Sequence, residues 1–415
     1  MNVAILTTLQ NLDSKYSVAT IVKSQVKMLA TAGHNVHLLT IDSFQTDEVL
    51  PCVAHSVIPT LPLVDYSAID EVSGEFDEQV GKVNKALCAF FKENDIDVVI
   101  THDWIFIGWF LPHNAAMRQV AVNCPNVKWL HWIHSGPSQR IQGLQGPRQL
   151  LQKTMLNSKL VFLNYTDVPR LAKMYDCSEQ DIEVVYNPID VADLWNFSEE
   201  TRYILEKVDC TSTDVLVVFP ASLSPGKQHS KAIKVVAGLK EAGMSVHLLF
   251  CNSWSNCDEA NNYIWQMKEL ATVWELEEDE VVFTSTLHKD LELGVARRTV
   301  TELLQLSNLF ILPSLSEACS MVLLEAAAAG NLLLLNEDFP AMREFGRSDC
   351  LYGKFSSVIF KTTYHDERGY FAGLAQEIQH KLQQSPLSMK RRILREFSSE
   401  SIYKNQLEPI LRGCG

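Results

Sequence analysis

Short apolar runs alternate with amphipathic stretches along most of the chain, and this pattern constrains the fold more than any other feature. Apolar runs of four to seven residues bounded by turn residues are typical of buried strands. Because helix-length segments separate them, they predict β-α-β units and a mostly parallel sheet. In the first half we expect helices at Val18–Ala32 and Asp77–Glu93, and strands at Val3–Thr7, Val36–Leu39, Val98–Thr101, Val127–His131, Leu160–Asn164 and Glu183–Tyr186.

A second alternating set follows a break at residues 187–190 and a polar stretch that reaches residue 214. A chain of 415 residues exceeds one comfortable core, so two domains are expected. The predicted fold class is α/β, with two Rossmann-like, doubly wound parallel-sheet domains facing across a cleft. The expected domains are 1–195 and 196–387, and a helix follows at 388–415. In the second domain, helices are expected at Lys227–Glu241 and Ala260–Trp274, and strands at Val215–Phe219, Val246–Phe250, Val281–Phe283, Leu309–Leu312, Leu332–Asn336 and Val358–Phe360.

Composition narrows the class of protein. Apolar residues make up 47% and charged residues 21% of the chain, which is ordinary for a soluble enzyme. No stretch is long and apolar enough to predict a membrane span, and the first residues read as a strand and not as a secretory signal. The ten cysteines show no metal-like clustering, which favours reduced thiols in a cytoplasmic protein without a bound metal.

The segment from residue 306 to residue 344 carries the strongest functional signal. A predicted strand ends at Pro313-Ser314, Glu317 lies in the loop, and a helix carries Glu325 two turns further on. Ligands of open α/β sheets bind at the carboxyl ends of the strands, and free N–H groups at a helix start attract anions. Two carboxylates beside an anion site suit a nucleotide sugar. The same spacing occurs elsewhere in the chain without a strand and loop, so one loop glutamate and one solvated helix glutamate is the alternative interpretation.

This segment resembles the donor-site signature of retaining glycosyltransferases with the GT-B fold, whose motif is E-x7-E after a strand ending in Pro-Ser. Here residues 313–330 read PSLSEACSMVLLEAAAAG. The resemblance implies that Glu317 contacts the donor sugar and Glu325 the nucleotide ribose. It also implies that the donor lies along Ala318, Cys319, Ser320 and Met321, and that the last helix crosses back to the first domain.

A second donor motif is expected where the first strand of the second half turns into a helix. Lys227 would face the diphosphate there, and a cation stabilises the negative charge that grows on the leaving nucleotide. The family pattern resembled is G-R-L-x-x-x-K-G. In this chain Ser222 stands at the arginine position and Gln228 at the last glycine. Either another basic residue such as Arg297 or Arg298 substitutes, or donor activation is weaker.

The first half offers candidates for binding the acceptor. Ser14 and Lys15 follow the first strand, in place of the glycine-rich loop that the family usually carries. Asp103 follows another strand and could orient an acceptor hydroxyl. His134 lies beyond the next strand end, and the resemblance implies a place near the transferred sugar. For each histidine and aspartate, a purely structural role is the alternative.

The predicted function is transfer of a sugar from a nucleotide-diphosphate donor to an acceptor hydroxyl with retention of configuration, the donor being a co-substrate and no cofactor being implied. A glycan or small metabolite is the expected acceptor. Residues 112–175 hold eight Lys or Arg against one acid, so a modified base in DNA is a second acceptor class, although the net charge of the chain is −14. The alternative is a non-catalytic nucleotide-sugar-binding protein of the same fold. The sequence leaves the oligomeric state open.

Overall fold

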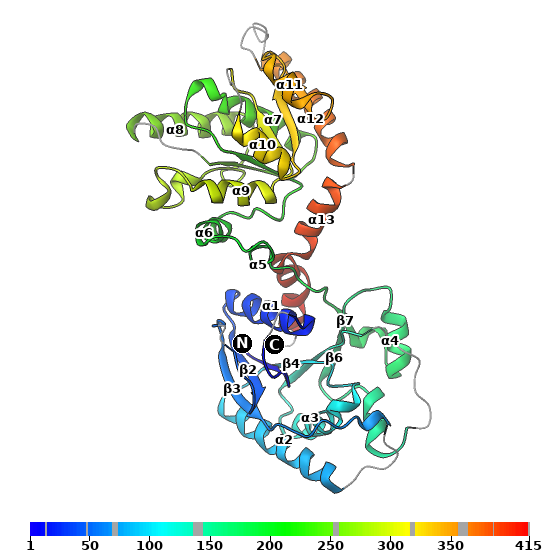
Figure 1. Cartoon of the computed structure of the whole chain (residues 1–415). Helices are drawn as coiled ribbons and strands as arrows, with labels where there is room; N and C mark the ends of the chain where they lie inside the picture. The colour runs from blue at the N-terminus through cyan, green and yellow to red at the C-terminus, as the bar shows by residue number, and fades with distance from the viewer. Residues whose placement is uncertain are drawn as a thin grey trace. The chain divides into compact units, whose positions relative to one another are not determined.

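The computed structural model describes residues 1–12, 15–46, 49–68, 74–135, 144–251, 257–315, 320–355, 364–384 and 386–413. The chain forms two compact units (Figure 1). The first comprises Met1–Asp190 together with Ser399–Gly415, and the second comprises Val191–Ser398. Each unit is built around its own parallel sheet, which confirms the predicted class of two Rossmann-like α/β domains.

The sheet of the first unit has seven strands in the order β3-β2-β1-β4-β5-β6-β7. Every pairing in it is parallel. The chain moves outward from β1 to β3 and then returns to the other side of β1, so the order reverses between β1 and β4. The strands are β1 (Asn2–Leu6), β2 (Asn35–Ile41), β3 (Val53–Ile58), β4 (Val98–His102), β5 (Lys128–Trp132), β6 (Ser158–Phe162) and β7 (Ile182–Val184).

Helices cover both faces of this sheet (Figure 1). Helices α2 (Gly74–Glu93) and α3 (Leu111–Asn123) pack on the face that carries Leu6 and Trp129. Helix α1 (Ser17–Thr31) packs on the opposite face, together with the C-terminal helices α14 (Ser399–Ile402) and α15 (Glu408–Gly413). Helix α4 (Val168–Tyr175) packs beside β6 and β7. Burial of the sheet on both faces explains why its strands read as continuous apolar runs.

The sheet of the second unit has six strands in the order β10-β9-β8-β11-β12-β13, again all parallel. Its order reverses between β8 and β11. The strands are β8 (Val215–Phe219), β9 (Val246–Phe250), β10 (Val281–Phe283), β11 (Leu309–Leu312), β12 (Leu332–Asn336) and β13 (Leu351–Gly353). The helices of this unit are α5 (Val191–Leu194), α6 (Glu199–Lys207), α7 (His229–Glu241), α8 (Cys257–Val273), α9 (Arg297–Leu306), α10 (Met321–Ala328), α11 (Ala341–Gly346), α12 (Tyr364–Leu382) and α13 (Leu387–Phe397).

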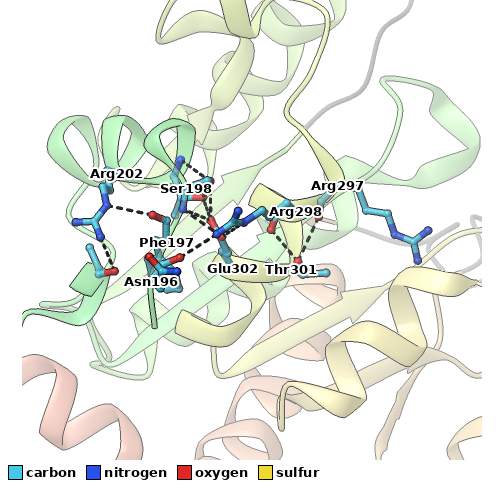
Figure 2. A network of polar contacts seen from close by, with 10 residues as sticks. Asn196, Phe197, Ser198, Arg202, Arg297, Arg298, Thr301 and Glu302 are labelled. Carbon is cyan, nitrogen blue, oxygen red and sulfur yellow. Dashed lines mark hydrogen bonds and ion pairs between the residues drawn. The ribbon is translucent and has the colours of Figure 1, made fainter. Parts of the chain in front are cut away.

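Helices α6 and α9 cap each other through two glutamates. Glu302 of α9 accepts hydrogen bonds from the Ser198 amide at 3.0 Å and the Ser198 hydroxyl at 2.7 Å, at the start of α6 (Figure 2). In return, Glu200 of α6 accepts the amide of Ala296 at 2.8 Å, at the start of α9. Burial would raise the pKa of Glu302, but the hydrogen bonds from Thr201, Ser198 and Arg298 outweigh it and hold that pKa at about 2.

The end of the chain differs from the single helix expected over 388–415. Helix α13 ends at Phe397, Ser398 is extended, and α14 begins at Ser399. The buried Arg391 ties α13 to the second unit, because its guanidinium donates to the carbonyl of Cys210 at 3.0 Å and to Thr213 Oγ1 at 2.6 Å. The Ser399 amide donates to the carbonyl of Ile189 at 3.1 Å, within the first unit.

Two observed strands were not predicted from the sequence, and one expected strand falls outside the described residues. Strand β3 is half exposed and reads VAHSVI, so it lacks the continuous apolar run used to predict the others. Strand β13 has only three residues and ends at a glycine. The expected strand Val358–Phe360 lies outside the described residues.

Candidate functional site

The two loops predicted to bind the donor follow neighbouring strands of the second sheet. Strands β8 and β11 lie side by side at the point where the strand order reverses. Loops that leave the carboxyl ends of two such strands diverge to opposite faces of the sheet and leave a crevice between them, and ligands of open α/β sheets bind there. The strand order therefore gives the two sequence motifs one shared location.

The loop after β8 forms a tight turn that contains Lys227. A single 3-10 turn covers Pro225–Lys227, and Gln228 follows with φ of +57°, in the left-handed region that favours glycine. Such a conformation suits the last glycine of the pattern G-R-L-x-x-x-K-G, which this part of the chain resembles. The Gln228 side chain donates to the carbonyl of Pro225 at 2.9 Å, which offsets part of the strain. Lys227 and Ser222 are both half-buried.

A backbone hydrogen bond joins this turn to the loop after β11. The amide of Leu315 donates to the carbonyl of Gly226 at 3.0 Å. The neighbouring Ser314 is buried, and its carbonyl accepts the side-chain amide of Asn336 at 3.0 Å. Asn336 ends β12, so three adjacent strand ends hold the beginning of this loop in place. Glu317, Ala318 and Cys319 of the predicted site lie outside the described residues.

Helix α10 begins at Met321, as expected, and ends before Gly330. Ser320 is the N-cap residue of α10, but its side chain makes no capping hydrogen bond. Neither its hydroxyl nor the first amides of the helix are therefore used in a side-chain cap. Met321 is 55% exposed. Glu325 lies one turn further, and its carboxylate pairs with Arg297 at the start of α9. The two arginines considered as substitute cations therefore have different partners. Arg297 pairs with Glu325, whereas Arg298 donates to Glu302 at 2.6 Å.

In the first unit, Asp103 and His134 lie together at the ends of β4 and β5. The amide of His134 donates to Asp103 Oδ1 at 2.8 Å, and the amide of Asp103 donates to the carbonyl of Trp132 at 2.8 Å. Asp103 has φ of +62°, so its backbone is in the left-handed region that aspartate tolerates better than most residues. The strand order of this sheet reverses between β1 and β4, which puts Asp103 at the reversal point.

A histidine not singled out in the sequence, His102, contacts His134 directly. Their rings stack with centroids 5.1 Å apart, and Nδ1 of His102 lies 2.9 Å from Nε2 of His134, so one ring donates a hydrogen bond to the other. Burial and the neighbouring His134 lower the pKa of His102, and burial lowers the pKa of His134 to about 4. Burial raises the pKa of Asp103 to about 6, against the opposing hydrogen bond from His134. The position of His102 at a predicted strand end, next to Asp103 in the sequence, is the signal that could have identified it.

The other two acceptor candidates of the first unit, Ser14 and Lys15, precede α1 in the sequence. Lys15 is exposed in the turn that precedes this helix. Ser14 lies outside the described residues. The turn follows β1, which borders β4 at the reversal point of the sheet, so Lys15 and Asp103 belong to loops from neighbouring strands.

The basic region 112–175 contains interior as well as surface charges. Arg118 is satisfied inside the fold, where its guanidinium donates to Asn114 Oδ1 at 2.8 Å and to the carbonyl of Thr154 at 2.7 Å. Arg170 is exposed and pairs with Asp167 at 2.7 Å. Arg140 lies outside the described residues. Within the described part of the chain, no cluster of three or more histidine, cysteine or carboxylate side chains could hold a metal ion, and no helix is long and apolar enough to cross a membrane.

Comparison with known proteins identifies one region. Residues 203–347 match the family model described as "Glycosyl transferases group 1". Among solved structures, a glycosyltransferase from Rickettsia africae is 15% identical, with a TM-score of 0.37, and the match covers 100% of this chain and 98% of that one. A sucrose-phosphate synthase from Thermosynechococcus elongatus is 14% identical, with a TM-score of 0.38 and all of both chains covered. No curated protein sequence matches the chain significantly.

The assignment rests on the family match, because the two solved structures named above have low identities and TM-scores. The matched residues contain both predicted donor loops, from Ser222 and Lys227 to Glu317 and Glu325. The resemblance noted from the E-x7-E segment is therefore confirmed for this part of the molecule: residues 203–347 of the second unit match the model of the glycosyl transferases group 1 family.

Proposed function

We propose that the protein transfers a sugar from a nucleoside-diphosphate donor to an acceptor hydroxyl and retains the anomeric configuration. The observation that carries this proposal is the hydrogen bond from the Leu315 amide to the Gly226 carbonyl at 3.0 Å. It joins the Lys227 turn to the E-x7-E loop at the point where the strand order reverses. The turn that contains the Lys227 cation meets the beginning of the loop that carries a carboxylate in its sequence. Such a pair of loops suits a ligand with a diphosphate and many hydroxyls.

Each part of this site has a role in the proposed reaction. Lys227 and the first amides of α10, near Ser320 and Met321, stabilise the negative charge that grows on the leaving diphosphate. Glu317 holds the hydroxyls of the donor sugar, and Glu325 holds the ribose. The departing diphosphate takes the acceptor proton on the face from which it leaves, so the mechanism requires no enzyme nucleophile and no metal ion.

The first unit supplies the acceptor side of the reaction in this proposal. His134 and Asp103 lie at the ends of adjacent strands and are joined by a 2.8 Å hydrogen bond, so they form one rigid pair. With its pKa at about 4, His134 is neutral at pH 7. Because its Nε2 contacts His102 and its Nδ1 is buried, in this proposal His134 shapes the acceptor site together with Asp103 and does not take the acceptor proton. Ser14 and Lys15 would extend the acceptor contact.

Donor turnover with defined variants tests this function. The purified protein is incubated with uridine, guanosine, adenosine and thymidine diphosphate sugars, released nucleotide is measured, and NMR reports the anomeric configuration of the product. We expect turnover of one donor with retention and a loss of about 100-fold in Lys227→Ala, the magnitude typical of one charge-stabilising group. Lys268→Ala is the matched control and should turn over normally, because Lys268 is a half-buried lysine on α8 whose partner is Glu278. Inversion of configuration would contradict the mechanism.

The same experiment separates the second candidate, a non-catalytic nucleotide-sugar-binding protein. Ser222 at the position of the family arginine favours that candidate, because one of two cations expected at the diphosphate is missing. Binding of a nucleotide sugar without turnover, across a panel of glycan, metabolite and DNA acceptors, would establish it. A DNA acceptor predicts in addition that binding weakens steeply with salt, since the basic residues of 112–175 would displace counterions.

A further inference from the structure

Arg297 holds one oxygen of the Glu325 carboxylate, and the other oxygen has no hydrogen-bond partner among the described residues. Its Nε donates to Glu325 Oε1 at 2.9 Å, and its second terminal nitrogen donates to the same oxygen. Within the described residues, Oε2 of Glu325 makes no hydrogen bond. Carboxylates usually bind the arginine fork with one oxygen per nitrogen. Here the fork is concentrated on one oxygen, so the second oxygen is oriented and free to accept.

The position of Arg297 is not explained by the stability of its own helix. It is the first residue of α9, where a positive charge is opposed by the helix dipole. Its neighbour Arg298 has a structural partner, because it pairs with Glu302 in the network that joins α9 to α6. Figure 2 shows Arg297 extending away from that network. The side chain of Arg297 remains 70% exposed, whereas that of Glu325 is 15% exposed.

Glu325 needs a partner, because its surroundings are apolar. Its side chain is 15% exposed in α10, where every other residue is apolar, and a carboxylate covered to that extent is costly unless it is paired. Arg297 supplies the pair from a separate helix, at a distance of 28 residues in the sequence. The contact therefore orients the carboxylate as well as placing an opposite charge beside it, since guanidinium donors are fixed in one plane.

We propose that Arg297 is a positioning residue of the donor site, which aims Oε2 of Glu325 at a ribose hydroxyl and so makes the enzyme select ribonucleotide donors over deoxyribonucleotide donors. This inference rests on the proposed function. A site that holds a substrate hydroxyl with an oriented, desolvated acceptor rejects the analogue that lacks the hydroxyl, because the acceptor is then left unpaired. A positive charge that neutralised Glu325 without orienting its carboxylate would not produce that preference for ribonucleotides.

The test measures affinity for matched pairs of nucleotides by calorimetry on the full chain. The probes are UDP, GDP and ADP with their 2′-deoxy and 3′-deoxy counterparts. For the diphosphate that binds, we expect the wild type to prefer the ribonucleotide over at least one deoxy form by about 10- to 100-fold, the range of one hydrogen bond to a charged group. Arg297→Gln should reduce that ratio to about onefold to threefold. Arg298→Gln, on the adjacent exposed arginine, should leave it unchanged.

Arg297→Lys distinguishes positioning from simple charge neutralisation. Lysine keeps the positive charge next to Glu325 but lacks the planar fork. If Arg297 positions the carboxylate, Arg297→Lys unfolds at nearly the wild-type temperature and still loses most of the ribose preference. If Arg297 only neutralises Glu325, the lysine variant keeps the preference, and the inference is wrong.

Two further outcomes separate this inference from the proposed function. Binding of a diphosphate with an unchanged ribose preference in Arg297→Gln would overturn the inference alone. Equal binding of ribo and both deoxy forms by the wild type would overturn it as well, and would leave donor binding intact. Thymidine diphosphate completes the panel: if it binds and UDP, GDP and ADP do not, the inference alone is overturned, because that nucleotide lacks the 2′-hydroxyl. Failure of every diphosphate, thymidine diphosphate included, to bind the wild type would refute the donor site, and the role of Arg297 with it.

Discussion

His113 is a buried histidine whose titration links the stability of the first unit to pH. Its ring lies on α3 with its centroid 4.9 Å from that of Trp104, and neither ring nitrogen has a hydrogen-bond partner among the described residues. Burial lowers the pKa of His113 to about 4. In the unfolded chain it titrates near 6.5. Between these values the unfolded state takes up a proton that the folded state excludes, so stability falls as the pH falls.

Replacing His113 by phenylalanine should therefore make the protein more resistant to acid. At pH 4.5 the variant should recover roughly 2–3 kcal/mol of the free energy of unfolding that the wild type loses relative to pH 7.5. Urea denaturation at the two pH values measures this difference. His380→Gln, on an exposed position of α12, is the control. An equal acid loss in wild type and His113→Phe would show that His113 is not buried in its neutral form.

At the residue scale the sequence predicted positions better than partners. The Lys227 turn and the start of α10 at Met321 follow from local signals, a strand end and a loop of small residues. The contact between Arg297 and Glu325 does not, because it joins two helices separated by a strand and a loop. The stacking of His102 on His134 depends likewise on the pairing of β4 with β5.

At the scale of elements, the reciprocal capping of α6 and α9 makes a sharp prediction for Glu302. Glu302→Gln should destabilise the start of α6 by roughly 1–3 kcal/mol, because its charged acceptor serves the Ser198 amide, the Ser198 hydroxyl and Thr201 Oγ1. Hydrogen exchange measured by mass spectrometry should show faster exchange across Glu199–Lys207. Glu206→Gln, exposed on the same helix, is the matched control. Unchanged protection of α6 in Glu302→Gln would mean that the network does not hold this helix.

The sequence predicted the strands in which most residues are buried and missed the two strands in which most residues are exposed or half-buried. Strand β11 is buried at all four positions and reads as a plain apolar run. Strand β3 has exposed or half-buried residues at every position but the last and carries a register shift at its pairing with β2, so its pattern resembles that of a loop. The C-terminal stretch reads as one helix by periodicity, and extended Ser398 interrupts it between contacts with different units.

At the scale of the molecule, two parallel sheets follow from the alternating pattern, but the order of their strands does not. Strand order depends on long-range pairing, which local periodicity leaves open. That order is what brings β8 beside β11 and joins the two motifs through Leu315 and Gly226. We propose above all that these motifs form one nucleotide-sugar site in the second unit.

Thermal unfolding of the wild type and of Glu325→Ala, each with uridine, guanosine, adenosine and thymidine diphosphate sugars, tests that claim most directly. Only a ligand that binds the folded state raises the unfolding temperature. We expect an increase of several degrees with one nucleotide for the wild type and none for Glu325→Ala. The variant without ligand serves as the control for its own stability. An equal increase in the variant, or no increase with any donor, would contradict the claim.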